Sequence, residues 1–97
     1  MKSLKNIIEI ISKNKRLLES RYNVKVIGIF GSYSKEQSRK RSDIDILVEF
    51  SKSPDFFEFI RLEEFLEGLL GIKVDLVTRN ALKPLIKDEI LKETIYI

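Results

Sequence analysis

The chain has 97 residues, of which 43% are hydrophobic and 34% are charged, so it has enough apolar material for a core and is not a disordered chain. It contains no cysteine and no histidine, which excludes disulfides, thiolate or imidazole zinc sites and histidine-dependent triads. The net charge of +3 is too small to indicate a nucleic-acid-binding tail. Catalysis by this chain would therefore use carboxylates, hydroxyls, lysine, arginine or a bound metal ion.

Charged residues interrupt the apolar N-terminal stretch, so it lacks the pattern of a signal peptide, and the apolar runs are too short to cross a membrane. We therefore expect a cytoplasmic protein without membrane contact, folded as one domain over residues 1–97.

The first half of the chain predicts one long helix and two strands. Residues 3–20 form an amphipathic helix with Ser3 as N-cap, because apolar side chains recur at helical spacing: Leu4, Ile7, Ile8, Ile11 and Leu18. Residues 24–30 (VKVIGIF) are β-branched and apolar, which indicates a buried strand. After a break at Gly31-Ser32, residues 33–41 are polar and basic and predict a short helix and loop. Residues 43–50 (DIDILVEF) alternate and predict a second strand.

The second half predicts a helix, a strand and a closing helix. Ser53-Pro54-Asp55 predicts a helix start with Ser53 as N-cap, and Gly71 predicts its end. This helix has an apolar face made of Phe59, Leu62, Leu66 and Leu69. Residues 73–77 predict a third strand, and a last helix restarts at Pro84 with an apolar face made of Leu85, Ile86 and Ile90. The pattern indicates an α/β (α+β) fold, in which helices pack on a small sheet.

Three aspartates lie in these apolar strands, although aspartate is disfavoured in strands. Asp43 and Asp45 are two residues apart and so project from the same face of the sheet, with the apolar residues around them facing the core. Asp75 points opposite to its apolar neighbours in KVDLV. Neighbouring carboxylates repel each other, and a hard cation such as Mg²⁺ relieves that repulsion. The acids therefore predict a magnesium site, in which the third carboxylate, Asp75, could bind a second metal ion or take the proton of an attacking hydroxyl.

Gly31 and Ser32 follow the first strand and form a candidate phosphate-binding turn. Glycine lets the backbone approach a ligand closely, and serine can open a helix whose N–H groups favour phosphate. The short connection to Asp43 would bring this turn beside the carboxylates. Taken singly, a Gly-Ser turn, an Asp-x-Asp pair or the basic residues 39–41 would more simply be a loop or solvated surface, so the prediction depends on their combination.

The stretch GSYSKEQSRKRSDIDILVEF resembles the signature of the DNA polymerase beta nucleotidyltransferase superfamily, which is Gly-Ser, ten residues and then Asp-x-Asp. Here Gly31-Ser32 is followed by residues 33–42 and then by Asp43-Ile44-Asp45. The later KVDLV matches the strand that carries the family's third carboxylate. The resemblance covers nearly the whole chain, and the small size is similar to that of the minimal nucleotidyltransferases of bacteria and archaea.

This resemblance implies the nucleotidyltransferase fold with a mixed sheet, ATP as substrate, and Mg²⁺ as cofactor. It implies that Asp43 and Asp45 bind metal, that Asp75 completes the metal site or serves as base, and that Gly31 and Ser32 hold the triphosphate. Many members are encoded beside a HEPN-domain RNase toxin and act as antitoxins by adenylylating a tyrosine of that partner. One departure is Glu36, which stands where family sequences often have glycine.

Three other functions stay open at this point. The chain could neutralise a toxin only by binding it, and the aromatic residues Phe56, Phe57 and Phe59 could serve such a contact, although a helix must bury one face. It could instead act on a small-molecule acceptor, for which a partner or a homo-oligomer would have to complete the pocket. Nucleic-acid binding through residues 39–41 is disfavoured, because aromatic residues do not alternate with the basic ones.

Overall fold

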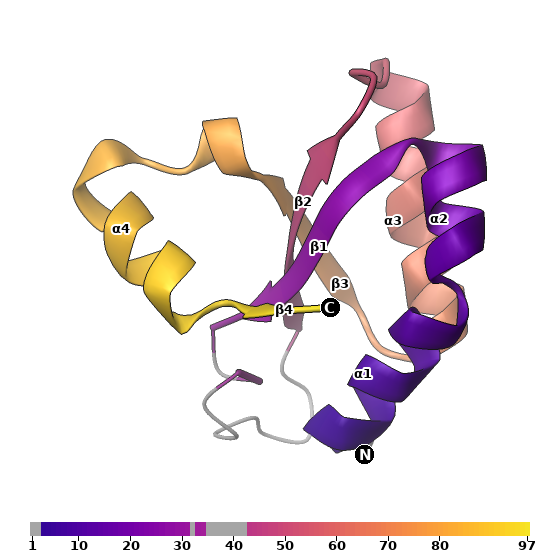
Figure 1. Ribbon diagram of the computed structural model, residues 1–97, viewed down its shortest axis with the longest axis horizontal. Helices are drawn as coiled ribbons and strands as arrows, with labels where there is room; N and C mark the ends of the chain where they lie inside the picture. Colours follow the sequence, from indigo (N-terminus) through magenta and orange to yellow (C-terminus); the bar gives the residue numbers. More distant parts are fainter. Residues whose placement is uncertain (1–2, 32, 35–42) are drawn as a thin grey trace.

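The computed structural model describes residues 3–31, 33–34 and 43–97. Its centre is a four-stranded sheet with helices on both faces (Figure 1). The strand order is β3-β2-β1-β4, with bounds β1 (Val24–Phe30), β2 (Ile44–Phe50), β3 (Val74–Thr78) and β4 (Ile95–Tyr96). Strand β2 is antiparallel to β1 and parallel to β3, and β4 is antiparallel to β1. The expected α/β fold with a mixed sheet is confirmed.

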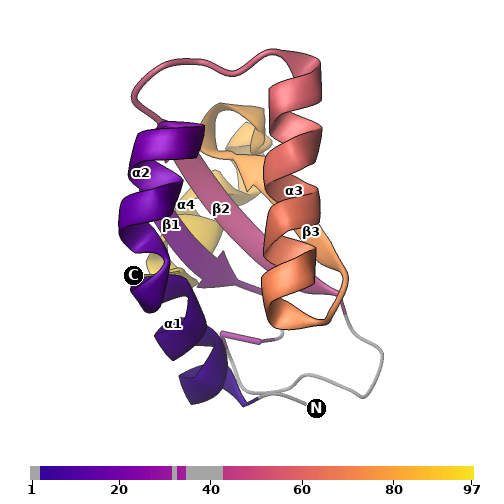
Figure 2. The ribbon, with the colours of Figure 1, turned by 90° about the vertical axis from the view of Figure 1, so that its right-hand side faces the viewer.

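Three helices cover one face of the sheet, which we call the helical face: α1 (Leu4–Lys13), α2 (Lys15–Tyr22) and α3 (Phe56–Leu70) (Figure 2). Strand residues that point to this face alternate with residues that point away from it, as the period of a strand requires. Fully buried apolar side chains from the strands and helices meet here, among them Ile7, Ile11, Ile27, Ile29, Ile44, Ile46 and Leu66. The main hydrophobic core therefore lies between the helical face and these helices.

The N-terminal helical region is two helices, so the prediction of one continuous helix over residues 3–20 is wrong. The chain leaves helical geometry at Asn14, whose φ is −103° and ψ is 8°. The Asn14 side-chain amide donates to the carbonyl of Ile10 at 2.8 Å, a local side-chain to backbone bond of the kind that competes with a continuous helix. Ser3 is the N-cap of α1, as predicted, and accepts a hydrogen bond from the backbone N–H of Asn6 at 3.2 Å.

Helix α3 begins two residues later than predicted. Its N-cap is Asp55 rather than Ser53, because Asp55 forms a capping box with Glu58, in which each side chain accepts a hydrogen bond from the other residue's backbone N–H. Gly71 ends the helix in left-handed geometry with φ of 68°, as its position in the sequence predicted.

Strands β3 and β4 lie at opposite edges of the sheet, so the chain must cross one face to connect them. The connection contains the short helix η1 (Arg79–Ala81) and α4 (Pro84–Glu93), and we call the face that it crosses the crossover face (Figure 1). Strand β4 was not predicted from the sequence. It lies so close to β1 that a Cβ atom on Gly28 would run into the Thr94 side chain and lie 3.1 Å from the carbonyl oxygen of Ile95.

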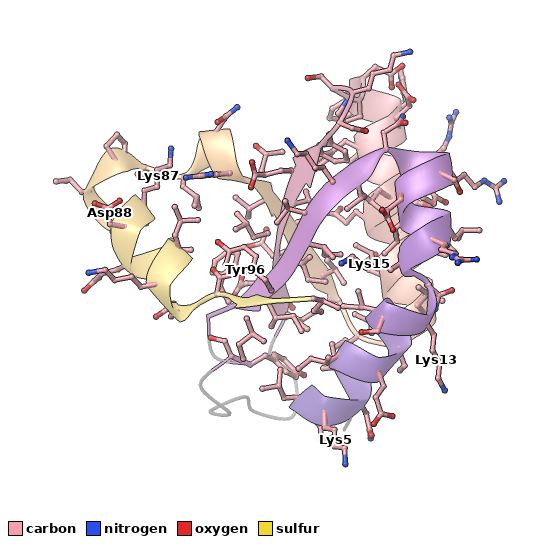
Figure 3. The ribbon with its side chains drawn as sticks, viewed as in Figure 1. Lys5, Lys13, Lys15, Lys87, Asp88 and Tyr96 are labelled. Carbon is pink, nitrogen blue, oxygen red and sulfur yellow. The ribbon has the colours of Figure 1, made fainter. Side chains whose placement is uncertain are left out.

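Helix α4 lies against β1 only loosely, and most of its predicted apolar face of Leu85, Ile86 and Ile90 is not buried. Leu85 is 98% exposed and Ile86 is 46% exposed, while Ile90 is partly buried. Lys87 and Asp88 mark the middle of this helix in Figure 3, and Tyr96 lies on the α4 side of the sheet. In the described part of the chain, every helix is too short or too polar to span a membrane.

Candidate active site

The end of β1 and the start of β2 are held side by side, as the short connection between them predicted. In the antiparallel register Phe30 is opposite Asp45. The next residue, Gly31, has a φ of 74°, and a Cβ atom at that position would overlap the Asp45 carboxylate. Only glycine therefore fits this turn comfortably, both for its backbone angle and for its proximity to the carboxylate.

The turn after Gly31 is fixed by Ser34, whose hydroxyl donates to the Gly31 carbonyl oxygen at 2.8 Å. This contact was not anticipated from the sequence, where a serine at that spacing is too common to be a signal. The second predicted phosphate-binding residue, Ser32, lies outside the described residues, as do Glu36 and most of the predicted helix and loop over residues 33–41.

Strands β2 and β3 bring the second carboxylate beside the third. Their parallel register places Asp45 directly opposite Asp75, and neighbouring strands lie about 4.8 Å apart. The backbone N–H of Ile44 donates to the Lys73 carbonyl oxygen at 2.9 Å, which fixes this register one residue before the pair. The first residue of β3, Val74, is in turn held by the Glu67 carboxylate, which accepts from its backbone N–H at 2.9 Å.

Asp45 and Asp75 belong to the crossover face, as the alternation of the strands predicted, and Asp43 comes directly before β2. Ile44 and Ile46 are fully buried on the opposite, helical face, and so Asp45 between them must point to the crossover face. Asp45 is partly buried, whereas Asp43 and Asp75 are exposed. The sequence pattern could not distinguish these exposures, because burial of Asp45 depends on Gly31 and on β3.

The surroundings of Asp45 change the pKa of its carboxyl group. Burial, the charge of Asp75, a side-chain hydrogen bond with Asp75 and the charge of Asp43 together raise the pKa of Asp45 from its ordinary 3.8 to about 6, and burial is the largest of these causes. Asp45 therefore holds a proton more readily than an exposed aspartate does. A divalent cation would replace that proton and remove the repulsion that causes the shift.

The described residues do not form a complete metal-binding site. Among residues 3–31, 33–34 and 43–97, no three acidic side chains are gathered closely enough to hold an ion by themselves. Asp45 and Asp75 form a hydrogen-bonded pair, and Asp43 acts on the pair through its charge. This donor set suits Mg²⁺, which is usually held by one or two carboxylates together with phosphate oxygens and water.

A separate hollow lies at the other ends of β2 and β3. Its volume is about 450 Å³, and it is lined by residues that include Glu49, Phe50, Phe56, Phe59 and Arg79. Glu49 and Arg79 form an ion pair of 3.8 Å across it. Sequence reasoning missed this hollow, although the run of phenylalanines at the start of α3 was visible.

A model of the nucleotidyltransferase domain family matches residues 5–97, which include the carboxylates, Gly31 and every strand. The chain belongs to this family. It is a nucleotidyltransferase of the minimal type, as the resemblance implied, and the relatives below agree with that assignment.

The nucleotidyltransferase resembles curated archaeal proteins over its full length. It is 49% identical over 98 residues to "Putative protein adenylyltransferase MJ0128" of Methanocaldococcus jannaschii, with 100% of both chains covered. It is 43% identical to the protein adenylyltransferase MntA of Thermococcus cleftensis, with 100% of this chain and 98% of MntA covered.

Solved structures agree with the fold. A structure described as "Structure of putative minimal nucleotidyltransferase" has a TM-score of 0.83 and 31% identity, with 97% of this chain and 95% of that chain covered. The crystal structure of a toxin–antitoxin with AMP-PNP has a TM-score of 0.68 and 25% identity, with 96% of this chain and 70% of that chain covered.

Proposed function

We propose that this nucleotidyltransferase transfers AMP from ATP to a hydroxyl group of a partner protein, a tyrosine of a HEPN-domain toxin, and thereby acts as an antitoxin. The observation that carries the proposal is the placement of the hydrogen-bonded Asp45–Asp75 pair beside Gly31 on one face of the sheet. That placement supports the proposal because it brings the proposed metal ligands next to the turn that we propose for the triphosphate.

The roles follow from where each residue lies. Asp43 and Asp45 would hold Mg²⁺ together with the phosphates, and Asp75 would complete the site or accept a proton. Gly31 and Ser32 would contact the triphosphate through their backbone, and the lack of a side chain on Gly31 lets the Asp45 carboxylate lie against this turn. The bound ion would neutralise charge on the phosphates and orient them.

In the proposed reaction, the acceptor hydroxyl displaces diphosphate from the α-phosphate of ATP. The acceptor hydroxyl oxygen forms a bond to the α-phosphorus, the bond from that phosphorus to the bridging oxygen breaks, and diphosphate leaves. The hydroxyl proton passes to a carboxylate, and Asp75 is well placed for this because it is exposed and directly opposite Asp45. Catalysis is then mainly positioning and electrostatic stabilisation.

The choice of acceptor draws support from the relatives. Several are named protein adenylyltransferases, and a structural neighbour at 25% identity is a toxin–antitoxin that was crystallised with a nucleotide analogue. A protein acceptor also suits the geometry, because Asp75 and Asp43 are exposed and a large partner can reach them from outside.

The test is transfer of label from α-³²P-ATP to a purified candidate HEPN-domain partner in the presence of Mg²⁺. We expect label on the partner with wild-type protein and none with the Asp43→Asn/Asp45→Asn double variant. Mass spectrometry of the labelled partner should place the AMP on a tyrosine. A stable complex that forms without any label would contradict transfer and favour neutralisation by binding alone.

A further inference from the structure

Tyr96, in β4, lies on the same face of the sheet as the acidic pair. In the antiparallel register it is opposite Gly28 of β1, and Phe30, two residues further along β1, is opposite Asp45. Residues directly opposite each other in paired strands, or two apart in one strand, point to the same face. Tyr96 therefore shares the crossover face with Asp45, and Figure 3 shows it on the α4 side of the sheet.

The neighbours of Tyr96 hold it in this orientation. The backbone N–H of Ile97 donates to the Ile27 carbonyl oxygen at 2.9 Å, and the Ile97 side chain packs against the main core. The Tyr96 ring lies over β1, because its Cδ1 atom is 3.3 Å from the place where a Cβ atom of Gly28 would lie. The ring thus leans from the edge of the sheet toward β2, yet 52% of the residue stays exposed.

The distance between Tyr96 and the acids follows from the geometry of the sheet. Neighbouring strands lie about 4.8 Å apart and rise about 3.3 Å per residue, so two strand spacings and two residues place the α-carbons of Tyr96 and Asp45 about 12 Å apart. Both side chains extend above the same face between these atoms. A tyrosine side chain and a phosphate held at the carboxylates together span this distance, so the phenolic oxygen is within reach of the phosphorus.

Tyr96 differs in this placement from the other two tyrosines of the chain. Tyr22 stacks on a phenylalanine of α3, with ring centroids 5.2 Å apart, on the helical side of the sheet. Tyr33 is 2% exposed and belongs to the main core. The nearby hydroxyl of Thr94 is buried and donates to the Ile90 carbonyl oxygen at 2.6 Å. Tyr96 is therefore the tyrosine whose hydroxyl an active-site nucleotide can approach.

We propose that Tyr96 is a self-modification site, to which the nucleotidyltransferase transfers AMP from ATP bound at its own carboxylates. The inference rests on the proposed transfer of AMP to hydroxyl groups, and it adds an acceptor within the chain itself. Because acceptor and donor site belong to one sheet, the transfer is intramolecular and needs no encounter with a second protein.

The chemical step is the same as for a partner's hydroxyl. The phenolic oxygen of Tyr96 forms a bond to the α-phosphorus, the bond from that phosphorus to the bridging oxygen breaks, and diphosphate leaves. The phenolic proton passes to a carboxylate, and Asp75 is exposed on the same face to receive it. The product is AMP joined to the chain through a phosphodiester on Tyr96.

A tyrosine in an edge strand can also serve only to cover the sheet, and phenylalanine would do this equally well. Tyr96→Phe keeps the ring over Gly28 and removes only the hydroxyl, so it separates a chemical role from a packing role. Tyr22→Phe is the matched control, because it removes the same atom from a tyrosine on the helical side of the sheet.

The experiment is incubation of the purified chain with ATP and Mg²⁺, without any partner, followed by mass spectrometry of the intact protein. We expect the mass of one added AMP on the wild type and on Tyr22→Phe. We expect no added mass on Tyr96→Phe or on Asp43→Asn/Asp45→Asn, and circular dichroism should show all variants folded. A wild type that stays unmodified, or AMP that persists on Tyr96→Phe, would overturn the proposal.

The modified residue can be located directly in the wild type. Trypsin cleaves after Lys92, so the AMP should be found on the peptide of residues 93–97. Fragmentation of that peptide should place it on Tyr96 and not on Thr94. AMP on any other residue would contradict the assignment.

A mixing experiment tests whether transfer stays within one chain. Asp43→Asn/Asp45→Asn retains Tyr96 as acceptor, and Tyr96→Phe retains the carboxylates, so a mixture of the two can be modified only by transfer between chains. We expect no AMP on either chain, and AMP on the chain without carboxylates would contradict the intramolecular step.

Addition of a HEPN-domain partner to the wild-type reaction distinguishes this inference from the proposed function. AMP on the partner with an unmodified chain would overturn self-modification and leave the proposed function standing. AMP on Tyr96 with an unmodified partner would support self-modification and contradict the proposed acceptor. An absence of AMP from both proteins would overturn both proposals.

Discussion

The same strands present apolar side chains on one face of the sheet and acidic side chains on the other. On the helical face, Ile44 and Ile46 are fully buried and join one continuous core. On the crossover face, Asp45 lies between them in sequence and carries a raised pKa beside Asp75. Because side chains alternate along a strand, a single seven-residue strand can hold the core together and present the reactive acids. Burial of apolar side chains on the helical face stabilises the fold, and this offsets the repulsion between the acids on the crossover face.

The separate roles of the two faces are tested first by removing one charge from the crossover face and leaving the helical face unchanged. Asp45→Asn should lower transfer of AMP by about 10³-fold or more, because it removes a proposed metal ligand at the centre of the acidic group. Its fold should survive, since the side chain contributes nothing to the core. Steady-state labelling measures the effect, with the exposed Asp88→Asn on α4 as control. Transfer within tenfold of wild type would contradict the metal assignment.

The opposite change removes volume from the helical face. Leu66→Ala should lower the free energy of unfolding by about 3 kcal/mol, because Leu66 is fully buried and the cavity would not collapse completely. Urea denaturation measures the loss, and the folded fraction should retain its rate of transfer. Leu85→Ala, at a 98% exposed position, should change stability by less than about 0.5 kcal/mol. If both variants had equal effects, the core would not lie where the structure places it.

Gly31 tests the contact between the β1 turn and the acids. Gly31→Ala should cost about 1–2 kcal/mol and also reduce transfer, because the added Cβ would strain a φ of 74° and displace the Asp45 carboxylate. Gly71→Ala is a matched control, since Gly71 also has a positive φ of 68° but has open space around it. That variant should lose stability with no change in transfer. Equal transfer in both variants would show that the turn does not position Asp45.

The smallest expected effect is on pH dependence. In metal-free protein, folded Asp45 keeps its proton up to about pH 6, whereas unfolded Asp45 releases it near 3.8. The folded state therefore binds more protons between these values, and its contribution to stability falls as pH rises through them. Relative to Asp45→Asn, the wild type should lose about 1 kcal/mol between pH 4 and 7, a value reduced by solvent screening. Denaturation in EDTA measures the difference, and Mg²⁺ with nucleotide should diminish it.

Much of this arrangement could be predicted from sequence because it depends on local pattern. The apolar run of β1 is bounded as predicted, and alternation placed Asp45 and Asp75 on one face. Ser3 is the N-cap of α1 and Gly71 ends α3, as their positions in the sequence predicted. These features are decided by a few neighbouring residues.

The remainder depends either on one local side-chain contact that the pattern does not reveal or on contacts between distant segments. Asn14 interrupts a stripe of apolar residues that is equally compatible with one helix, and Asp55 prevails over Ser53 only because Glu58 completes the capping box. The pairing of β4 with β1 requires the space left by Gly28, which a sequence does not reveal. The exposure of Leu85 and Phe57 likewise follows from where helices dock, and not from their own spacing.

The pairing of β4 with β1 has a consequence for synthesis on the ribosome. Gly28 is synthesised early, but its partner Tyr96 is added only after the residues of β2, α3, β3 and α4. Until then the nascent chain carries a strand with one unpaired edge, which is open to pairing with strands of other chains. Slow translation of the region before Ile95 would lengthen this exposure, so codon choice there should influence how much of the protein aggregates in cells.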